Sequence, residues 1–395
     1  MNICIVGGGT AGWMTASYLA SVLPNKITLI ESKDIPIIGV GESTVPSFTD
    51  FIKTVGLTEQ DLFNIGSIRK YSAKHCDWPE KGKDWHHYFI FDKSEEQEQI
   101  QWLENINLPN KHWRHSYHID ATKFSNLLRE RFQDKIDHNY DTIESVAYTE
   151  SGITKLIGEE REYTADLFID CSGLNQLLLK NFTNVTESNK SLINNKAWAG
   201  HADYTDKAGP VYYTRTYAMD YGWQWNICLQ DRAGCGYVFS DKHCDSKTAK
   251  QEFINKCPFK LREDSLKLID FKSKWNKRPW CANVLAVGLS AGFLEPLESQ
   301  SIFLTQMQIQ MLHRLISKDN SRNIYNRFWN IMIRHIAKYL ELHYTLSSRT
   351  DTTYWNSFNK TDTVLYNHSY SPLFHEYGHM AIAEAYGANL YKRLY

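Results

Sequence analysis

The chain opens with a glycine-rich segment whose spacing suits the binding of a dinucleotide. Gly7, Gly9 and Gly12 form the pattern Gly-x-Gly-x-x-Gly directly after a short apolar run, residues 2–6. Glycines at these positions permit a tight turn and let the backbone approach a pyrophosphate at the start of the following helix. Glu31, 19 residues after Gly12, stands where a carboxylate can accept hydrogen bonds from a ribose. The pattern predicts a dinucleotide site without separating FAD from NAD.

A second motif, near the C-terminus, has the spacing of metal ligands. His375-Glu376-Tyr377-Gly378-His379 fits the HExxH pattern, which places two histidines on one face of a helix. However, Gly378 weakens a helix, and no third ligand is evident in the remaining sixteen residues. We interpret this match as chance and predict no metal.

The elements that must position the glycine motif form a βαβ opening. The apolar run 2–6 is followed by a helical pattern over 13–19 and by a second strand pattern over 26–30. Two later apolar runs, 165–170 and 284–288, have the length of buried parallel strands. Because more than a hundred residues separate these pieces, the sequence predicts a discontinuous nucleotide-binding domain.

The remaining chain predicts a sheet and then helices. Residues 197–239 alternate aromatic and β-branched side chains between glycine breaks, which is typical of an antiparallel sheet. Residues 302–346 have helical spacing with few breakers. The predicted fold class is therefore α/β. The predicted domain limits are 1–78, 155–185 and 275–345 for the nucleotide-binding domain, 79–154 and 186–274 for a substrate-side region, and 346–395 for a C-terminal extension.

Composition and charge indicate an ordinary globular protein. The chain has 395 residues, of which 42% are hydrophobic and 23% charged, and its net charge is −1. Such a balance gives no long-range attraction to nucleic acid or to an anionic membrane. No apolar stretch is long enough to span a bilayer, and no signal peptide is evident. The eight cysteines are scattered without a CxxC pair. We therefore expect a cytoplasmic protein with reduced thiols and no membrane or nucleic-acid partner.

Several segments together resemble the flavin-dependent tryptophan halogenase family, as a shorter and divergent member. The glycine motif is common to many flavoproteins, whereas Trp223-x-Trp225-x-Ile227 and the stretch Glu-Pro-Leu-Glu-Ser ending at Ser299 are far more specific. The resemblance extends from residue 1 to about residue 355. The matching segments are 7–14, 39–46, 170–173, 222–227, 293–299 and 349–352.

This resemblance implies a Rossmann-like FAD-binding domain of the aromatic-hydroxylase type. It further implies that FAD is reduced by a separate flavin reductase, and that reduced FAD and O2 oxidise halide to hypohalous acid. That oxidant would pass through an interior tunnel to a small aromatic substrate. The residues expected at FAD are Gly7, Gly9, Thr10, Ala11, Gly12, Glu31, Gly39, Gly41, Glu42, Ser43, Asp170, Gly288, Pro296 and Leu297.

By motif position, the active-site lysine and glutamate of the family fall on Lys70 and Glu298. A lysine can donate a hydrogen bond to hypohalous acid, or its amine can itself be halogenated, and a carboxylate can take the proton from the ring intermediate. Lys74, one turn later if the segment is helical, competes for the role. Lys70 is favoured because its distance from Trp78 matches the family, although most lysines are simply exposed.

Further residues are implied around the flavin and the halide. Trp223 and Trp225 would shield the flavin, the alternative being an ordinary aromatic core pair. Ser299 is followed by Gln300 and Ser301, where the family has Thr-Gly, and a side chain at the glycine position changes the wall of the halide pocket. We therefore predict that bromide or iodide is used better than chloride.

The substrate side matches the family least closely. His87, Phe89 and Phe91 are candidates for stacking on a substrate ring, and a buried strand explains them equally well. Because no C-terminal residues that grip an amino acid can be placed, we predict a small indole or phenol as substrate. Two alternatives stay open: a flavin monooxygenase that inserts oxygen, and a catalytically silent FAD-binding protein. A monomer and a homo-oligomer are both compatible with the sequence.

Overall fold

The computed structural model of the chain describes residues 1–35, 39, 41–89, 114–366, 386 and 389–392. Phe91 and the segment 375–379, both singled out in the sequence, lie outside the described residues. The predicted βαβ opening is confirmed. It consists of β1 (Asn2–Val6), α1 (Thr10–Val22) and β2 (Lys26–Glu31).

A six-stranded sheet gathers segments that are far apart in the sequence. Its order is β21-β22-β12-β1-β2-β8, and all neighbours are parallel except β21 and β22. The two later apolar runs are its strands β12 and β22, so the predicted discontinuous assembly of this sheet is present. The remaining bounds are β8 (Asp137–Tyr140), β12 (Leu167–Asp170), β21 (Trp280–Cys281) and β22 (Val284–Ala286).

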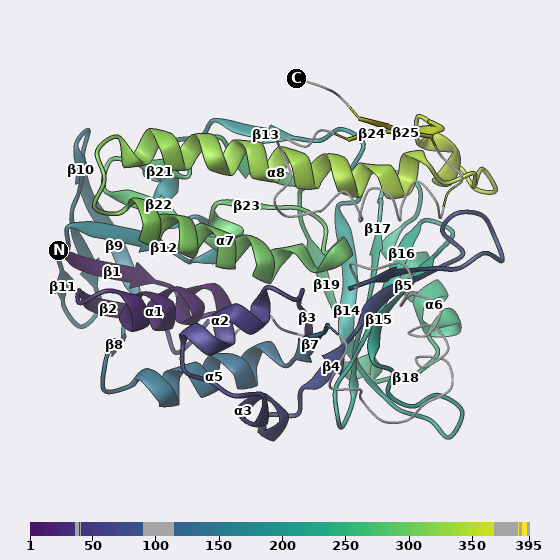
Figure 1. The fold of residues 1–395 in the computed structure, drawn as a ribbon, viewed down its shortest axis with the longest axis horizontal. Coiled ribbons are helices and arrows are strands. Elements are labelled where there is room, and N and C mark those ends of the chain that lie inside the picture. Colours follow the sequence, from purple (N-terminus) through teal and green to yellow (C-terminus); the bar gives the residue numbers. More distant parts are fainter. Residues whose placement is uncertain (36–38, 40, 90–113, 367–385, 387–388, 393–395) are drawn as a thin grey trace.

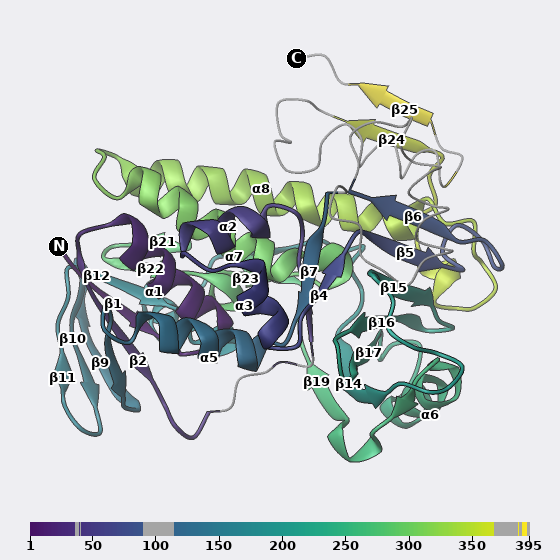
Figure 2. The same ribbon diagram turned by 60° about the horizontal axis from the view of Figure 1, so that its bottom comes forward.

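A second, eight-stranded sheet lies beside the first (Figure 2). Its order is β18-β14-β17-β16-β15-β5-β6 with β19 paired to β14, and only β5 and β15 run parallel. The antiparallel sheet predicted for 197–239 is confirmed, and its extension by β5 and β6 depends on pairing between distant segments. The strands are β5 (Ser72–Cys76), β6 (Trp85–Tyr88), β14 (Lys196–Asp203), β15 (Tyr213–Ala218), β16 (Gly222–Cys228), β17 (Ala233–Phe239), β18 (Lys260–Leu261) and β19 (Lys267–Asp270).

Two long helices cover the six-stranded sheet and reach toward the second one (Figure 1). The predicted helical stretch is divided into α7 (Gln300–Leu315) and α8 (Ser321–Thr345), because Asn320 adopts a left-handed φ of 56° just before α8. Within the described residues, no helix combines the length and the apolar character that crossing a bilayer demands. The other α-helices in the described part of the chain are α2 (Phe48–Thr54), α3 (Glu59–Asn64), α5 (Ala121–Phe132) and α6 (Ser246–Lys256).

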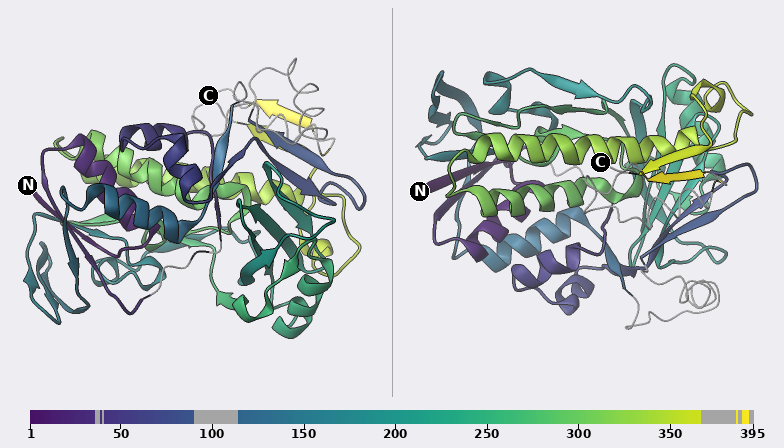
Figure 3. Two further views of the ribbon diagram at one scale, coloured as in Figure 1. Left: turned by 90° about the horizontal axis from the view of Figure 1, so that it is seen from below. Right: turned by 45° about the horizontal axis from the view of Figure 1, so that its top comes forward.

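Smaller elements connect these layers. Two of the small sheets matter for the site, because β3-β7-β4 lies between the two large sheets (Figure 3) and β13-β20-β23 leads into the turn before α7. The strands outside the two large sheets are β3 (Glu42–Ser43), β4 (Ile68–Lys70), β7 (Ser116–Ile119), β9 (Ile143–Thr149), β10 (Gly152–Gly158), β11 (Glu162–Tyr163), β13 (Thr186–Ser188), β20 (Lys274–Asn276), β23 (Gly292–Phe293), β24 (Thr363–Tyr366) and β25 (Asn389–Lys392). Short 3₁₀ turns are η2 (Gly173–Asn175), η3 (Leu179–Asn181), η4 (Glu263–Ser265), η5 (Gly288–Ser290), η6 (Leu297–Ser299) and η7 (Trp355–Ser357).

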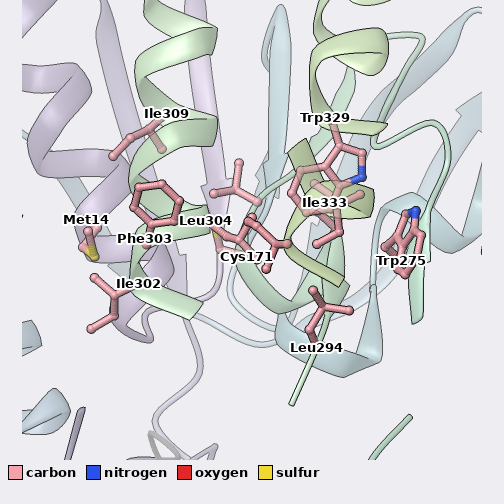
Figure 4. Packing of buried hydrophobic residues seen from close by; sticks show 14 of the residues in the cluster. Met14, Cys171, Trp275, Leu294, Ile302, Phe303, Leu304, Ile309, Trp329 and Ile333 are labelled. Carbon is pink, nitrogen blue, oxygen red and sulfur yellow. The ribbon is translucent and has the colours of Figure 1, made fainter. Parts of the chain in front are cut away.

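The main hydrophobic core holds α7 in place (Figure 4). Met14 of α1, Phe303 and Ile309 of α7, and Trp329 and Ile333 of α8 are all buried in it. Burying a side chain of this size contributes about 1.5–3 kcal/mol. The packing therefore gives α7 a firm position, and the first residues of this helix border the candidate active site. The domain limits proposed from the sequence stay a prediction.

Candidate active site

A cavity of about 550 Å³ extends from the glycine loop to the beginning of α7. This volume lies in the range of small-molecule and cofactor pockets. Of the residues expected at FAD, Gly12, Asp170 and Leu297 do not line it. Those that do are Gly7, Gly9, Thr10, Ala11, Glu31, Gly39, Gly41, Glu42, Ser43, Gly288 and Pro296.

The glycine loop leaves room for a pyrophosphate. A Cβ on Gly7 would lie 2.3 Å from the carbonyl oxygen of Cys171, and one on Gly12 would lie 1.8 Å from that of Gly7, so both positions require glycine. A Cβ on Gly9 would meet no atom within 4 Å, because Gly9 faces the cavity. Helix α1 begins here without a side-chain cap or an acidic residue in its first turn. Its first N–H groups are therefore available to an anion, and the loop fits FAD.

Two acidic residues expected at the cofactor have different surroundings. Glu31, 8% exposed at the end of β2, forms an ion pair with Arg129 (3.1 Å), lies 2.8 Å from Nε2 of His138 and lines the cavity. Asp170 is fully buried and accepts hydrogen bonds from the backbone N–H groups of Leu178 (2.8 Å) and Leu179 (2.9 Å). Asp170 thus organises the loop after β12, while Glu31 is placed to meet a ligand.

The turn before α7 holds two residues in strained backbone conformations. Glu298 and Ser299 have φ values of 62° and 61°, in the left-handed region that non-glycine residues avoid. Each such residue costs roughly 1–3 kcal/mol. Both residues line the cavity together with Gln300 and Ser301, and α7 starts there without a side-chain cap. The packing of α7 in the core holds Glu298 and Ser299 in these conformations. The resulting turn places the residues that begin the helix against the cavity.

Lys70 is buried at the end of β4, 1% exposed, and is held by two acceptors. Its Nζ donates to the carbonyl oxygen of Thr44 (3.1 Å) and to Oγ of Ser299 (3.0 Å). Burial lowers the pKa of Lys70 to about 7, against the opposing effect of the negative charge of Glu298. Lys74 differs: it lies on β5, not one helical turn after Lys70, and forms an ion pair with Asp84 (3.1 Å).

A directed chain of hydrogen bonds continues from Lys70 through Ser299. Oγ of Ser299 donates to Oγ of Ser43 (2.8 Å), which is 2.7 Å from Oγ1 of Thr214, which in turn is 2.9 Å from Nε2 of His118. Nδ1 of His118 lies 3.0 Å from the carbonyl oxygen of Cys228, which can only accept. This end determines every direction: His118 donates through Nδ1, so Thr214 donates to its Nε2 and Ser43 donates to Thr214.

Glu298 contacts three imidazoles. Its carboxylate is 2.8 Å from Nε2 of His75, 3.0 Å from Nδ1 of His87 and 3.0 Å from Nε2 of His343. Burial by itself would raise the pKa of Glu298, yet the charge of His87 and the polar contacts with His343 and His75 hold that pKa well below its usual range. Burial lowers the pKa of His75 to about 4. Glu298 is therefore ionised at neutral pH.

Lys70 contacts the turn that contains Glu298, 228 positions away in the sequence. Lys70 binds the side chain of Ser299, the residue after Glu298, and the negative charge of Glu298 opposes the lowering of the Lys70 pKa. Glu298, Ser299 and Gly9 line one continuous cavity, so the turn that Lys70 binds communicates with the glycine loop. The geometry is thus compatible with an oxidant formed at one end of the cavity and used at the other.

Trp223 and Trp225 lie on β16 and both line the cavity. Their ring centroids are 5.9 Å apart, and Nε1 of Trp223 is 3.5 Å from the buried carboxylate of Glu295. A Cβ on Gly236 of β17 would lie 2.0 Å from the ring of Trp225, so this glycine makes room for the indole. The two rings form a wall between the β-sheet and the cavity.

Of the substrate-side candidates, two are described. His87 lies on β6 against Glu298, and the ring of Phe89 has its centroid 5.0 Å from Nζ of Lys70. Both therefore lie beside the lysine and the glutamate. Their contact with a substrate ring stays a prediction.

Sequence reasoning missed several polar residues of this site. His75, His343, Thr214 and His118 have no motif spacing that relates them, because they come from β5, α8, β15 and β7. Glu295 belongs to a family motif, but the sequence assigned it no role. It is fully buried and accepts hydrogen bonds from Asn194 (2.6 Å) and Tyr344 (2.6 Å). Their convergence depends on the tertiary structure.

Comparisons with known proteins identify the family of this chain. The family described as tryptophan halogenase matches residues 2–104 and 92–391. A tryptophan 7-halogenase of Lentzea aerocolonigenes and a tryptophan 6-halogenase of Streptomyces albogriseolus are each 29% identical, over 90% of this chain and 78% of the relative. A flavin-dependent halogenase from Xanthomonas campestris superposes with a TM-score of 0.87 at 26% identity, covering 99% of this chain and 90% of that one.

A second structure, a flavin-dependent halogenase from Brevundimonas sp. BAL3, is similar with a TM-score of 0.86 at 26% identity, over 99% of this chain and 91% of its own. The fold and the cavity thus define a flavin-dependent oxidoreductase enzyme of the halogenase class. The chain belongs to the tryptophan halogenase family. Membership confirms the resemblance and the predicted α/β fold class, and it implies the use of FAD, O2 and halide.

Proposed function

We propose that this enzyme halogenates a small, electron-rich aromatic compound of the indole or phenol type through hypohalous acid. The observation that carries the proposal is the hydrogen bond from Lys70 to Ser299, which brings Lys70 to the turn that holds Glu298, beside a cavity continuous with the glycine loop. A relative named as a tryptophan halogenase supports an indole ring as substrate. Bound reduced FAD would supply, with O2, the two-electron oxidation of halide.

Lys70 would activate the oxidant. Two of its N–H groups are used by Thr44 and Ser299, and as an ammonium it keeps a third to donate to hypohalous acid, which makes the halogen more electrophilic. Glu298 would accept the proton released by the ring, since its pKa lies well below the usual range. The wall of Trp223 and Trp225 would keep the substrate away from the flavin and so prevent direct hydroxylation.

The halide is proposed to bind at the start of α7. The first N–H groups of this helix carry no side-chain cap, and an uncapped helix N-terminus favours an anion. Gln300 lines the cavity at this point, and its Nε2 donates a hydrogen bond to the carbonyl oxygen of Glu298 (3.0 Å). Because Gln300 and Ser301 replace Thr-Gly, we propose that the larger and more easily oxidised bromide or iodide is preferred over chloride.

The proposal includes a separate flavin reductase that delivers reduced FAD by diffusion, and a cytoplasmic location. All eight cysteines are free thiols, which is typical of a reducing compartment.

The test supplies chemically reduced FAD, O2 and each halide to a panel of indoles and phenols, and measures product masses. We expect halogenated products, with bromide or iodide outcompeting chloride. Hydroxylated products would support the monooxygenase alternative, and the absence of any oxidant would support a silent flavoprotein.

The matched variant is Lys70→Ala. This variant should yield no halogenated product. FAD binding, measured by flavin fluorescence, should stay unchanged, since Lys70 does not line the cavity proposed to hold FAD. Lys74→Ala is the control, because Lys74 is paired with Asp84 and should keep full activity. Equal activity of Lys70→Ala and the unmodified enzyme would exclude the proposed role.

A further inference from the structure

The carboxylate of Glu298 and two buried imidazoles converge in a way that a halogenase reaction does not require. Nε2 of His75 and Nε2 of His343 lie 2.8 Å and 3.0 Å from the same oxygen, Oε1 of Glu298. Both histidines are 0% exposed, and the three ligand atoms lie within 4.8 Å of one another. We call His75, His343 and Glu298 the histidine–glutamate cluster.

Nδ1 of each histidine, the nitrogen that points away from Glu298, has an oxygen partner that can accept a hydrogen bond. Nδ1 of His343 lies 3.3 Å from the carbonyl oxygen of Tyr339, which can only accept a hydrogen bond. Nδ1 of His75 lies 2.9 Å from Oγ1 of Thr216, a hydroxyl that can accept from this nitrogen while it donates to the carbonyl oxygen of Lys74 (3.4 Å). With the proton of each ring on Nδ1, Nε2 presents a lone pair on the side of Glu298, as a metal ligand does.

Nε2 of His75 is the least satisfied atom of the cluster. Its Nε2 is buried and makes no hydrogen bond, although it lies 2.8 Å from a carboxylate oxygen. A cation shared by this nitrogen and the carboxylate oxygen would satisfy both atoms. The cation of Lys70 is engaged elsewhere, by Thr44 and Ser299.

Such a set is also how proteins hold a transition metal. Two imidazole Nε2 atoms and one carboxylate, with each Nδ1–H bound to a carbonyl or hydroxyl oxygen, are the ligands and the supporting hydrogen bonds typical of zinc sites. His87, with Nδ1 3.0 Å from Oε2 of Glu298, stands close enough to supply a fourth ligand. Nitrogen and carboxylate donors suit zinc-type ions and not calcium or magnesium, which prefer oxygen alone.

We propose that the histidine–glutamate cluster is a binding site for a divalent transition-metal ion of the zinc type. The ion would occupy the carboxylate that the proposed reaction needs as proton acceptor, so bound metal would hold the enzyme inactive until it is removed. This consequence for activity rests on the proposed function, whereas the binding itself does not.

The binding test uses the full chain, stripped of metal by a chelator, without flavin, halide or substrate. Equilibrium dialysis against ZnCl2, with zinc measured by mass spectrometry, should find one zinc per chain. Replacing a ligand should weaken binding by roughly 100-fold or more in His343→Gln and in His75→Gln. No uptake by the unmodified chain, or unchanged uptake by both variants, would overturn the proposal.

Two controls make the outcome decisive. The double variant His375→Gln/His379→Gln removes the other zinc-like pattern in the sequence and should keep one zinc per chain, so loss of zinc in it would overturn the assignment to the cluster. Circular dichroism shows whether each variant is folded. If the cluster variants do not fold, Co²⁺ bound to the unmodified chain provides the answer: visible absorption bands of a four-coordinate nitrogen and oxygen site are expected, and the weak bands of an all-oxygen site would contradict the proposal.

The effect of zinc on halogenation is measured in a separate experiment. Zinc should suppress halogenation in the unmodified enzyme and a chelator should restore it. Zinc binding without any halogenation under any condition would refute the proposed function and leave the metal site standing.

Discussion

At the scale of single residues, the site stores unfavourable energy that the rest of the molecule must offset. Lys70 is buried, and Glu298 and Ser299 are held in left-handed conformations. Functional groups placed in this way lower stability in exchange for reactivity. Two predictions follow from the surroundings of Lys70.

The first concerns stability and pH. The folded pKa of Lys70, about 7, is below its ordinary value of 10.5, so between these values the unfolded chain binds more protons and the folded chain gains stability as the pH rises. Below pH 7 the cost of the buried charge is fully present. Lys70→Met should therefore raise the free energy of unfolding of FAD-free protein at pH 6 by on the order of a few kcal/mol. That advantage should shrink toward zero near pH 10. Urea unfolding at several pH values measures it, and an advantage independent of pH would show that the buried charge of Lys70 is not its cause.

The second prediction concerns the hydrogen-bond chain that ends at His118. Thr214→Val keeps the shape of the side chain but removes the hydroxyl, so that Ser43 loses its acceptor and Nε2 of His118 loses its donor. The position of Ser299 and Lys70 should become less defined, lowering kcat by roughly 10–100-fold with little change in KM. Thr214→Ser restores the hydroxyl and should restore kcat. A serine variant as slow as the valine variant would show that packing, and not the chain, is responsible.

At the scale of elements, the start of α1 separates two kinds of glycine. Gly12 is required by packing, since its Cβ would lie 1.8 Å from the carbonyl oxygen of Gly7, whereas Gly9 has open space and ordinary backbone angles. A close approach of backbone to backbone cannot be relieved by a rotamer change. The two positions therefore have different consequences when alanine is introduced.

Gly12→Ala should lower the free energy of unfolding of the FAD-free protein by roughly 1–3 kcal/mol, because α1 must move away from the loop. Gly9→Ala should leave that free energy nearly unchanged and yet weaken FAD binding, because the new methyl group enters the space proposed for the pyrophosphate. Chemical denaturation and flavin fluorescence titration distinguish the two effects. Full FAD affinity in Gly9→Ala would place the pyrophosphate elsewhere.

At the scale of the whole molecule, the cavity joins the two large sheets. It is lined by Gly7 and Glu31 from the six-stranded sheet and its loops, and by Thr216, Trp223 and Trp225 from the eight-stranded sheet. A ligand that fills it contacts both, so its binding energy is shared by the whole fold.

FAD at about 100 times its Kd should therefore raise the free energy of unfolding by about 2.7 kcal/mol. Calorimetry should show one unfolding transition that moves to higher temperature as FAD is added. Two transitions, of which only one responds to FAD, would show that the ligand contacts a single part of the chain.

Much of the fold could be predicted because many of its elements produce a recognisable pattern within a short stretch of sequence. The βαβ opening, the buried strand patterns at β12 and β22, and the aromatic strands of 197–239 each depend on periodicity within a few residues. The pairing of β5 with β15 could not be predicted, since it joins Ser72 to Tyr213. Two helices in place of one continuous stretch also escaped prediction, because the left-handed turn at Asn320 has no glycine to mark it.

The sequence by itself determined the family and the glycine loop, and it singled out Lys70 and Glu298, the proposed reactive side chains, because each belongs to a contiguous motif. Only the tertiary structure decided that Glu298 meets His75 and His343, and that Lys70 is linked through Ser299 to His118. These partners lie on β5, α8, the turn before α7 and β7. The physical reason is that contacts across a buried site depend on how sheets and helices pack, and no spacing along the chain records that packing.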